Sequence, residues 1–193
     1  MTPPKIVAFS GSSRTGSYNR LLLAAAVEAA RAAGAEVTVV DLRELALPLM
    51  DQDLEAASGL PAGAKKFKSL LLASDGFLIA SPEYNSAFTP LLKNAIDWAS
   101  RTESDDEPAL AAYRGKTAAL CSASPSALGG LRGLVGLRAL LGNIGVLVLP
   151  DQVTVSSAYE AFDEAGKLLD PRKAKQIADL AETLVDTIAK LRG

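Results

Sequence analysis

The chain has 193 residues, 49% of them hydrophobic, and its 20 basic residues nearly balance its 22 acidic residues. This length suffices for one domain with a sizeable core, and the balanced charge gives no electrostatic signature of nucleic-acid binding. The absence of histidine excludes Ser-His and Cys-His catalysis and removes the commonest metal ligand, so an enzyme built from this chain would depend on a cofactor, with no catalytic side chain and no metal.

Short apolar runs alternate along the chain with longer helical patterns. In chain order, the predicted elements are a strand at Lys5–Ser10, a helix at Tyr18–Ala33, a strand at Glu36–Asp41, a helix at Ala62–Ala73, a strand at Gly76–Ser81, a helix at Thr89–Ser100, a strand at Thr117–Cys121, a helix at Gly130–Leu141, a strand at Val146–Pro150 and a helix at Arg172–Leu191. Five apolar strands separated by helices predict an α/β fold, in which a parallel sheet is covered on both faces.

Two polar connections, Met50–Gly63 and Arg101–Tyr113, are longer than the others. The second contains the acidic run Glu103–Glu107, which we interpret as a solvated loop. Neither connection has the composition of a linker, so we treat residues 1–193 as a single domain. The one cysteine excludes an internal disulfide, and Cys121 lies in an apolar run, which favours a buried side chain over a reactive thiol.

No apolar run approaches the length of a membrane span, and Ile6–Phe9 is too short for the apolar core of a signal peptide. The apolar runs are typical instead of strands buried inside a globular domain. We therefore expect a cytoplasmic protein that has neither membrane nor nucleic-acid partners.

Ligands of an open parallel sheet bind at the carboxyl ends of the strands, near the point where the strand order reverses. This rule selects the loops that follow Ser10, Ser81 and Cys121. The first of these loops, Ser10–Asn19, contains five serine and threonine side chains, two glycines and one arginine, and it runs directly into a helix.

The composition of this first loop indicates an anion site. A helix start offers free N–H groups and a positive dipole end, Gly11 and Gly16 let the backbone bend around a ligand, and Arg14 supplies a permanent positive charge. The pattern is neither a P-loop nor a dinucleotide fingerprint, and its dense hydroxyls suit a terminal monophosphate such as that of FMN. The alternative is a Ser/Gly-rich turn in which Ser17 or Asn19 merely caps the helix.

The second loop, Ser81–Asn85, is suited to a flat ring. Pro82 stiffens the loop, Tyr84 offers an aromatic face, and Asn85 can exchange hydrogen bonds with the edge of an isoalloxazine. The alternative is an exposed turn in which Tyr84 packs over the core.

The third loop, Ser122–Gly130, consists mostly of small residues and ends at a predicted helix start. Such clusters are usually ordinary loops, so it is weak evidence by itself. Gly133 and Gly136 in the following helix are either close-packing positions or positions that weaken the helix.

Three segments, taken in this order, resemble the NADPH-dependent FMN reductase family, which includes quinone, chromate and azo-dye reductases. They are Gly11–Asn19, Ser81–Asn85 and Leu92–Trp98, the last reading LKNAIDW. The resemblance extends from Ile6 to about Gly145. It implies a flavodoxin-like three-layer fold with a five-stranded parallel sheet in the order 2-1-3-4-5, FMN as cofactor, and assembly as a homodimer or homotetramer.

The resemblance also implies roles for individual residues. In this family the first motif holds the FMN phosphate, the Pro-Glu-Tyr-Asn segment wraps the flavin ring, and a serine after the fourth strand touches the flavin. The cofactor-binding residues implied for this chain are Gly11, Ser12, Ser13, Arg14, Ser17, Tyr18, Asn19, Pro82, Glu83, Tyr84, Asn85 and Ser124.

The segment Phe88–Ser100 carries more apolar side chains than one helix face usually buries, namely Phe88, Leu91, Leu92, Ile96 and Trp98. Together with the resemblance, this excess suggests a subunit interface. The alternative is that the same side chains pack on the sheet.

The expected activity is hydride transfer from NADPH or NADH to FMN, followed by reduction of a small acceptor such as a quinone, chromate, an azo dye or free flavin. Because the loops crowd one face of the ring, donor and acceptor are expected to use the other face in turn. One rival is a flavodoxin-type one-electron carrier, which the mild net charge of −2 disfavours because such carriers dock through strongly acidic faces. A second rival is a non-redox mononucleotide-binding protein.

Overall fold

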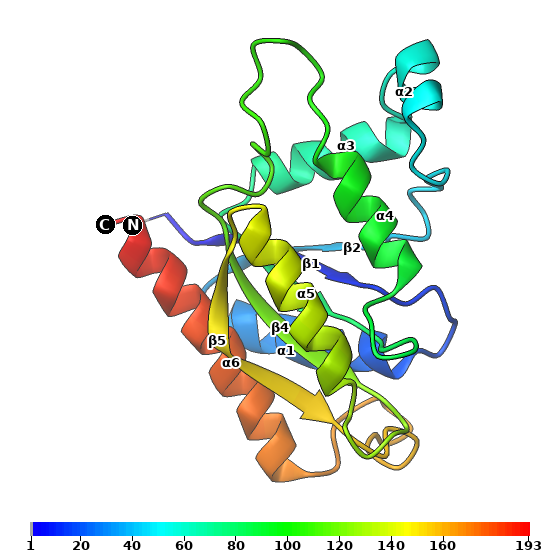
Figure 1. Cartoon of the computed structure of the whole chain (residues 1–193). Coiled ribbons are helices and arrows are strands. Elements are labelled where there is room, and N and C mark those ends of the chain that lie inside the picture. Colours follow the sequence, from blue (N-terminus) through cyan, green and yellow to red (C-terminus); the bar gives the residue numbers. More distant parts are fainter. Residues whose placement is uncertain (1) are drawn as a thin grey trace.

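A computed structural model describes residues 2–193, which form five strands and six helices (Figure 1). The elements are β1 (Lys5–Ser10), α1 (Tyr18–Ala32), β2 (Glu36–Val40), α2 (Gln52–Ser58), α3 (Ala62–Leu72), β3 (Gly76–Ala80), α4 (Pro90–Ala99), β4 (Thr117–Ala123), α5 (Leu131–Asn143), β5 (Leu147–Val155) and α6 (Pro171–Leu191). All strand pairs are parallel, and the order is β2-β1-β3-β4-β5. The predicted five-stranded flavodoxin-like sheet is therefore confirmed.

Successive side chains of the central strands point into two separate cores. Ile6 and Ala8 of β1 pack beneath α1 and α6, whereas Val7 and Phe9 pack against α3, α4 and α5. Because helices cover both faces, every residue of β3 is buried, which is why its sequence is continuously apolar and does not alternate. Cys121 lies in the first core, where burial raises the pKa of its thiol to about 12, so the prediction of a buried cysteine is confirmed.

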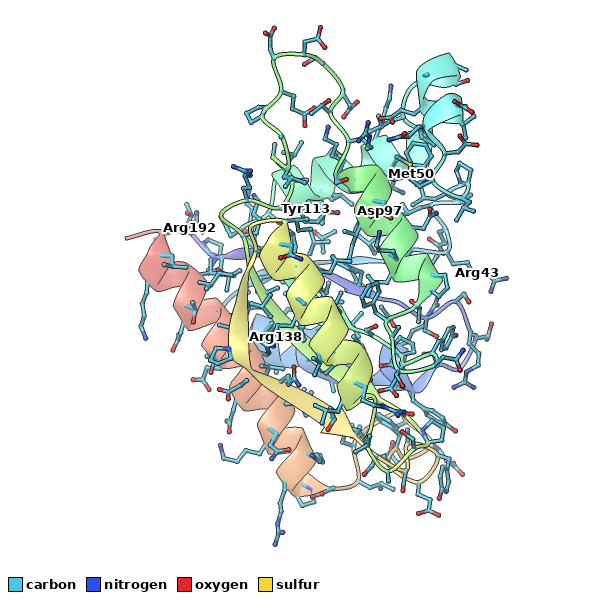
Figure 2. The ribbon with its side chains drawn as sticks, in the orientation of Figure 1. Arg43, Met50, Asp97, Tyr113, Arg138 and Arg192 are labelled. Carbon is cyan, nitrogen blue, oxygen red and sulfur yellow. The ribbon has the colours of Figure 1, made fainter. Side chains whose placement is uncertain are left out.

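The predicted end of β5 at Pro150 is wrong, because the strand continues to Val155. β5 is an edge strand whose pairing with β4 shifts register between Ala118 and Leu120, so Pro150 lies in an irregular stretch where no ladder hydrogen bond is needed. Arg138 of α5 lies over this stretch and donates hydrogen bonds to the carbonyls of Leu149 (2.6 Å) and Pro150 (3.1 Å) (Figure 2). The neighbouring β4 likewise ends two residues later than predicted, at Ala123.

A short helix, α2, lies within the connection that the sequence marks only as polar. Asp51 caps it, its carboxylate accepting hydrogen bonds from the N–H groups of Asp53 (2.8 Å) and Leu54 (3.3 Å). The seven residues of α2 bury no side chain, so the sequence carries no apolar periodicity that would predict the helix.

The apolar side chains of α4 are largely used inside the chain. Leu92, Ile96 and Trp98 are each at most 2% exposed, so they give no support for a subunit interface. Leu92 and Ile96 pack in the core against the sheet, whereas Trp98 packs with Leu60 and Ala64. The Trp98 indole and the Asn94 amide both donate to the carbonyl of Pro48, each at 2.8 Å. The LKNAIDW motif therefore clamps the connection after β2 onto α4.

The acidic loop between α4 and β4 is anchored rather than simply solvated. Lys68 of α3 is 1% exposed, and its ammonium bonds the Glu107 carboxylate at 2.6 Å and the Arg101 carbonyl at 2.8 Å. Glu103 lies at 3.5 Å from the same nitrogen. Because the loop precedes β4, it lies at the amino ends of the strands, far from the three loops selected above.

The longest helix among residues 2–193 is α6, with 21 residues. Neither α6 nor any shorter helix in that range combines the length and the apolar character that a membrane crossing requires.

Candidate functional site

Three loops leave the sheet side by side at the carboxyl ends of β1, β3 and β4. Backbone hydrogen bonds continue past the strand ends, from Gly11 N–H to Ala80 O (2.9 Å) and from Ser81 N–H to Cys121 O (3.0 Å). The strand order reverses between β1 and β3, so these loops surround the position where parallel sheets bind ligands.

A cleft of about 380 Å³ lies between the loops. Its lining includes nine of the twelve sequence-predicted residues: Ser12, Arg14, Ser17, Tyr18, Asn19, Pro82, Glu83, Tyr84 and Ser124. Ala123 and Pro125 complete it. Sequence reasoning missed these two because they present no side-chain polarity, although their place after β4 was a usable signal.

The first loop presents unpaired donors to the cleft. Ser17 is the N-cap of α1, yet its hydroxyl makes no capping hydrogen bond. Within residues 2–193, the N–H groups of Tyr18 and Asn19 have no acceptor, and Arg14 forms no ion pair. Gly16 has a φ of +66°, which places the turn ahead of the helix in the left-handed region that glycine tolerates.

Within the described part of the chain, Arg20, a second arginine near this loop, forms an ion pair, unlike Arg14. Arg20 is paired with Asp41 at 2.6 Å and donates to the carbonyl of Ser12 at 3.4 Å. Arg20 therefore holds the backbone of the first loop and does not line the cleft. Arg43 lies at the periphery, with a long contact of 3.4 Å to Ser13 O (Figure 2). Of these arginines, only Arg14 lines the cleft.

The side chain of Asn19 is fully engaged with the backbone of β4. Its amide donates to Ala123 O at 2.7 Å and accepts from Ala123 N–H at 2.9 Å. Asn19 is 4% exposed, so this reciprocal pair is shielded from water. The side chain thus joins the first loop to the third, and direct contact between Asn19 and a phosphate stays a prediction, with its backbone N–H as the available donor.

The second loop ends in a tight hairpin turn. The backbone groups of Tyr84 and Ala87 exchange hydrogen bonds of 2.9 and 3.0 Å, and Asn85 and Ser86 between them have φ values of 51° and 68°. Positive φ at both central residues is the geometry of a type I′ turn, which favours asparagine at its first central position. The turn leaves Tyr84 half-exposed beside the cleft.

The Glu83 carboxylate is turned away from the cleft centre and onto the start of α5. It accepts hydrogen bonds from the Arg132 guanidinium (2.5 Å) and from Gly133 N–H (3.1 Å). Burial raises the pKa of Glu83, but the Gly133 and Arg132 hydrogen bonds outweigh it and hold the pKa below its ordinary value. Gly133 is a close-packing position, because an added Cβ would lie 3.2 Å from Ala87 O and 3.3 Å from Glu83 Cβ.

Three of the predicted residues do not line the cleft. Gly11 packs against the start of α4, where an added Cβ would lie 2.8 Å from the Thr89 hydroxyl that donates to Gly11 O. Ser13 is exposed on the outer side of the first loop, and Asn85 serves the hairpin turn. Their contacts with a cofactor stay predictions.

The third loop covers a hydroxyl that has no partner. Ser122 Oγ, at the end of β4, is buried and makes no hydrogen bond to any of residues 2–193. A buried unpaired hydroxyl costs about 1–3 kcal/mol. We therefore expect Ser122→Ala to raise the free energy of unfolding by about 1 kcal/mol, measured by urea titration.

Ser74→Ala is the matched control, because Ser74 is also buried but its hydroxyl donates to Leu71 O at 2.8 Å. That change should lower the stability. A loss of stability in both variants would contradict the description of Ser122 as unpaired.

The chain is similar to known proteins along nearly its whole length. A family model described as NADPH-dependent FMN reductase matches residues 4–160. The chain is 36% identical to an NAD(P)H-dependent FMN reductase of Pseudomonas aeruginosa, over 98% of this chain and 97% of that protein. It is 34% identical to an NAD(P)H:quinone oxidoreductase of Solanum tuberosum, over 98% and 95% of the two chains. Among solved structures it is similar to FerB, a flavoenzyme NAD(P)H:(acceptor) oxidoreductase of Paracoccus denitrificans, with a TM-score of 0.79, 26% identity, and coverage of 97% and 98%.

Proposed function

Since this chain belongs to the NADPH-dependent FMN reductase family, we propose that the cleft between its three loops is where FMN binds and where a quinone is reduced. The protein is an NAD(P)H-dependent oxidoreductase that uses FMN. When bound, FMN supplies the redox chemistry by taking a hydride from NAD(P)H and passing two electrons to the acceptor. The side chains bind, orient and shield it.

The donors of the first loop fit a phosphate monoester. Ser12 and Ser17 place hydroxyls at the cleft, the start of α1 adds the free N–H groups of Tyr18 and Asn19, and Arg14 adds an unpaired positive charge. The one carboxylate in the lining, Glu83, is held on Arg132 and Gly133, so its charge is compensated. This set of unpaired donors at a helix start is the observation that carries the proposal.

The opposite side of the cleft fits a flat ring. Pro82 and Tyr84 offer apolar surface from the second loop, and Ser124 and Pro125 bound the cleft from the third. Tyr84 remains 49% exposed, so the ring face beside it would be open to a second flat molecule. The nicotinamide and the acceptor would use this face in turn.

The choice of acceptor rests on the relatives. Two plant proteins that match nearly the whole chain are described as quinone oxidoreductases acting with NADPH or NAD(P)H. Chromate, azo dyes and free flavin are the other acceptors that the same open face would admit. Either NADPH or NADH would serve as donor.

The assembly and location complete the proposal. We place residues 1–193 in one FMN-binding domain, because both cores pack on the same sheet. A homodimer or homotetramer is proposed, with the exposed Leu131 and Val135 of α5 as contact surface beside the site. A cytoplasmic location would give access to reduced nicotinamide.

Anaerobic mixing tests the activity. Protein reconstituted with FMN should lose the visible absorbance of oxidised flavin on addition of NADPH or NADH, and a quinone should restore that absorbance. Free FMN at the same concentration is the control. If neither nicotinamide reduces the bound flavin while a chemical reductant does, the protein is a flavodoxin-type carrier. A protein that takes up no FMN would be a different mononucleotide-binding protein.

A further inference from the structure

We propose that Phe162 positions Arg14 for the FMN phosphate through a stack of three side chains; this inference rests on the proposed function. The Arg14 guanidinium carbon lies 5.0 Å from the centroid of the Tyr18 ring. The same ring is stacked on Phe162, with the two centroids 6.2 Å apart and the planes only 5° from parallel. The stack ends at the phosphate side of the cleft, since Arg14 and Tyr18 both line it.

Phe162 is held by a hairpin that follows β5. The residue pairs with Leu168, and the turn between them is closed by a hydrogen bond from Lys167 N–H to the Asp163 carboxylate at 2.8 Å. Gly166 in the turn lies so near α1 that an added Cβ would be 2.9 Å from the Leu21 side chain. The hairpin therefore lies along the face of α1 that carries Tyr18.

The same segment is tied to the cleft itself. Ala158, which precedes the hairpin, is fully buried and donates its N–H to Ser124 O at 3.2 Å. Tyr18 and Phe162 are each partly buried against the core beneath α1 and α6. Phe162 is thus held by its contacts with the core and with the Tyr18 ring.

The stack reduces the entropy that the Arg14 side chain would lose on binding an anion. An exposed arginine loses much side-chain entropy when it is ordered, and within residues 2–193 no carboxylate holds Arg14. A cation–π contact with the Tyr18 ring holds the guanidinium without neutralising its charge. The ring is in turn fixed by Phe162, so Arg14 is pre-organised for an anion, which lowers the cost of binding.

Phe162 lies beyond the residues that the family model matches, which end at 160. The three segments that carry the resemblance to the family therefore assign it no role. Its function is visible only from the arrangement of the side chains in space.

Titration of the apoprotein with FMN and with riboflavin tests the inference, because riboflavin has the same ring and no phosphate. Arg14→Ala should raise the Kd for FMN about tenfold to a hundredfold. Phe162→Ala should raise the Kd for FMN about threefold to tenfold, because this change removes the ring that supports Tyr18 but keeps the positive charge of Arg14. Neither change should alter the Kd for riboflavin by more than about twofold.

The double variant separates positioning from a general effect on the fold. If Phe162 acts through Arg14, Phe162→Ala should add nothing to Arg14→Ala. Leu169→Ala, a change at a side chain that is 59% exposed on the same hairpin, is the control and should leave both Kd values unchanged. Phe162→Tyr keeps a flat ring and should restore the FMN affinity.

Each contrary result has a distinct meaning. Equal losses of FMN and riboflavin affinity in Phe162→Ala, or an unchanged Kd for FMN, would overturn the positioning role. If Phe162→Ala does not fold, Phe162→Leu removes the flat ring with less loss of packing and is judged by the same ratio of Kd values. If Arg14→Ala itself leaves the preference for FMN over riboflavin unchanged, the proposed phosphate site fails as well.

Discussion

Gly130→Ala is expected to lower the free energy of unfolding by about 3 kcal/mol, the largest effect of any single methyl group near the site. Gly130 is the N-cap of α5 and has a φ of +93°, where an alanine costs about 1–2 kcal/mol. The added Cβ would also lie 1.9 Å from Ser122 Oγ and 2.9 Å from Ser122 Cβ. A contact that short must displace either β4 or the start of α5.

Gly34→Ala separates the backbone cost of a positive φ from the steric cost of the added Cβ. Gly34 has almost the same φ, +94°, but nothing lies within 4 Å of its Cβ position, so only the backbone cost should appear. Denaturant unfolding should therefore give a smaller loss for Gly34→Ala than for Gly130→Ala. Ser122→Ala combined with Gly130→Ala should recover part of the difference. Equal losses for the two glycines would refute the steric explanation.

The same substitution should weaken FMN binding. The start of α5 holds the Glu83 carboxylate through Gly133 N–H and Arg132, and Glu83 belongs to the loop that borders the cleft. A shift of α5 breaks this attachment and leaves the Glu83 carboxylate uncompensated in the lining of the cleft. The FMN affinity of Gly34→Ala, whose change lies at the far end of α1, should stay unchanged.

Glu107→Ala is expected to cost about 2–4 kcal/mol, because it leaves the ammonium of Lys68 buried without its main partner. Lys68→Met should cost less. Glu107 is 18% exposed on its side chain and Glu103 is 39% exposed, so both carboxylates can turn to water once the lysine is gone. Asp179→Ala, which breaks an exposed pair with Lys175, should have no measurable effect.

The contribution of Glu107 should depend on pH. Its hydrogen bond to Lys68 outweighs the effect of burial and holds the pKa of Glu107 below the ordinary 4.5. This stabilisation is therefore complete above pH 4.5 and is lost as the pH falls through the lower pKa of the folded state. Unfolding experiments across the acid range should show a steeper loss in the natural chain than in Glu107→Gln. Equal slopes would mean that this pair contributes nothing to stability.

Much of the fold could be predicted because both faces of the sheet are covered. Continuous apolar runs such as Phe77–Ala80 occur in strands buried on two sides, and the parallel-sheet rule then places the loops after β1, β3 and β4 together. What escaped prediction depends on partners distant in sequence. Pro150 ends a strand by local rules, but Arg138 of α5 supplies donors at that point.

The same limit applies to the candidate site. The sequence identifies Asn19 and Glu83 as polar residues in the correct loops, but not which groups occupy their hydrogen bonds. In the structure, the Asn19 side chain forms hydrogen bonds with the backbone of Ala123, and the Glu83 carboxylate accepts hydrogen bonds at the start of α5. Among the arginines, local sequence likewise does not distinguish Arg14 from Arg20, because only the position of Asp41 on a neighbouring strand end decides which charge stays unpaired.

The pairing of Asn19 with Ala123 also determines when, during synthesis, the proposed phosphate site takes its final shape. The two residues are 104 positions apart, so Ser12–Asn19 leave the ribosome long before the strand that fixes them has been made. A nascent chain that stops before β4 has the whole serine- and arginine-rich motif but no fixed shape for it. With FMN at the proposed site, we expect flavin uptake to follow translation of most of the chain, and amino-terminal fragments to emerge without flavin.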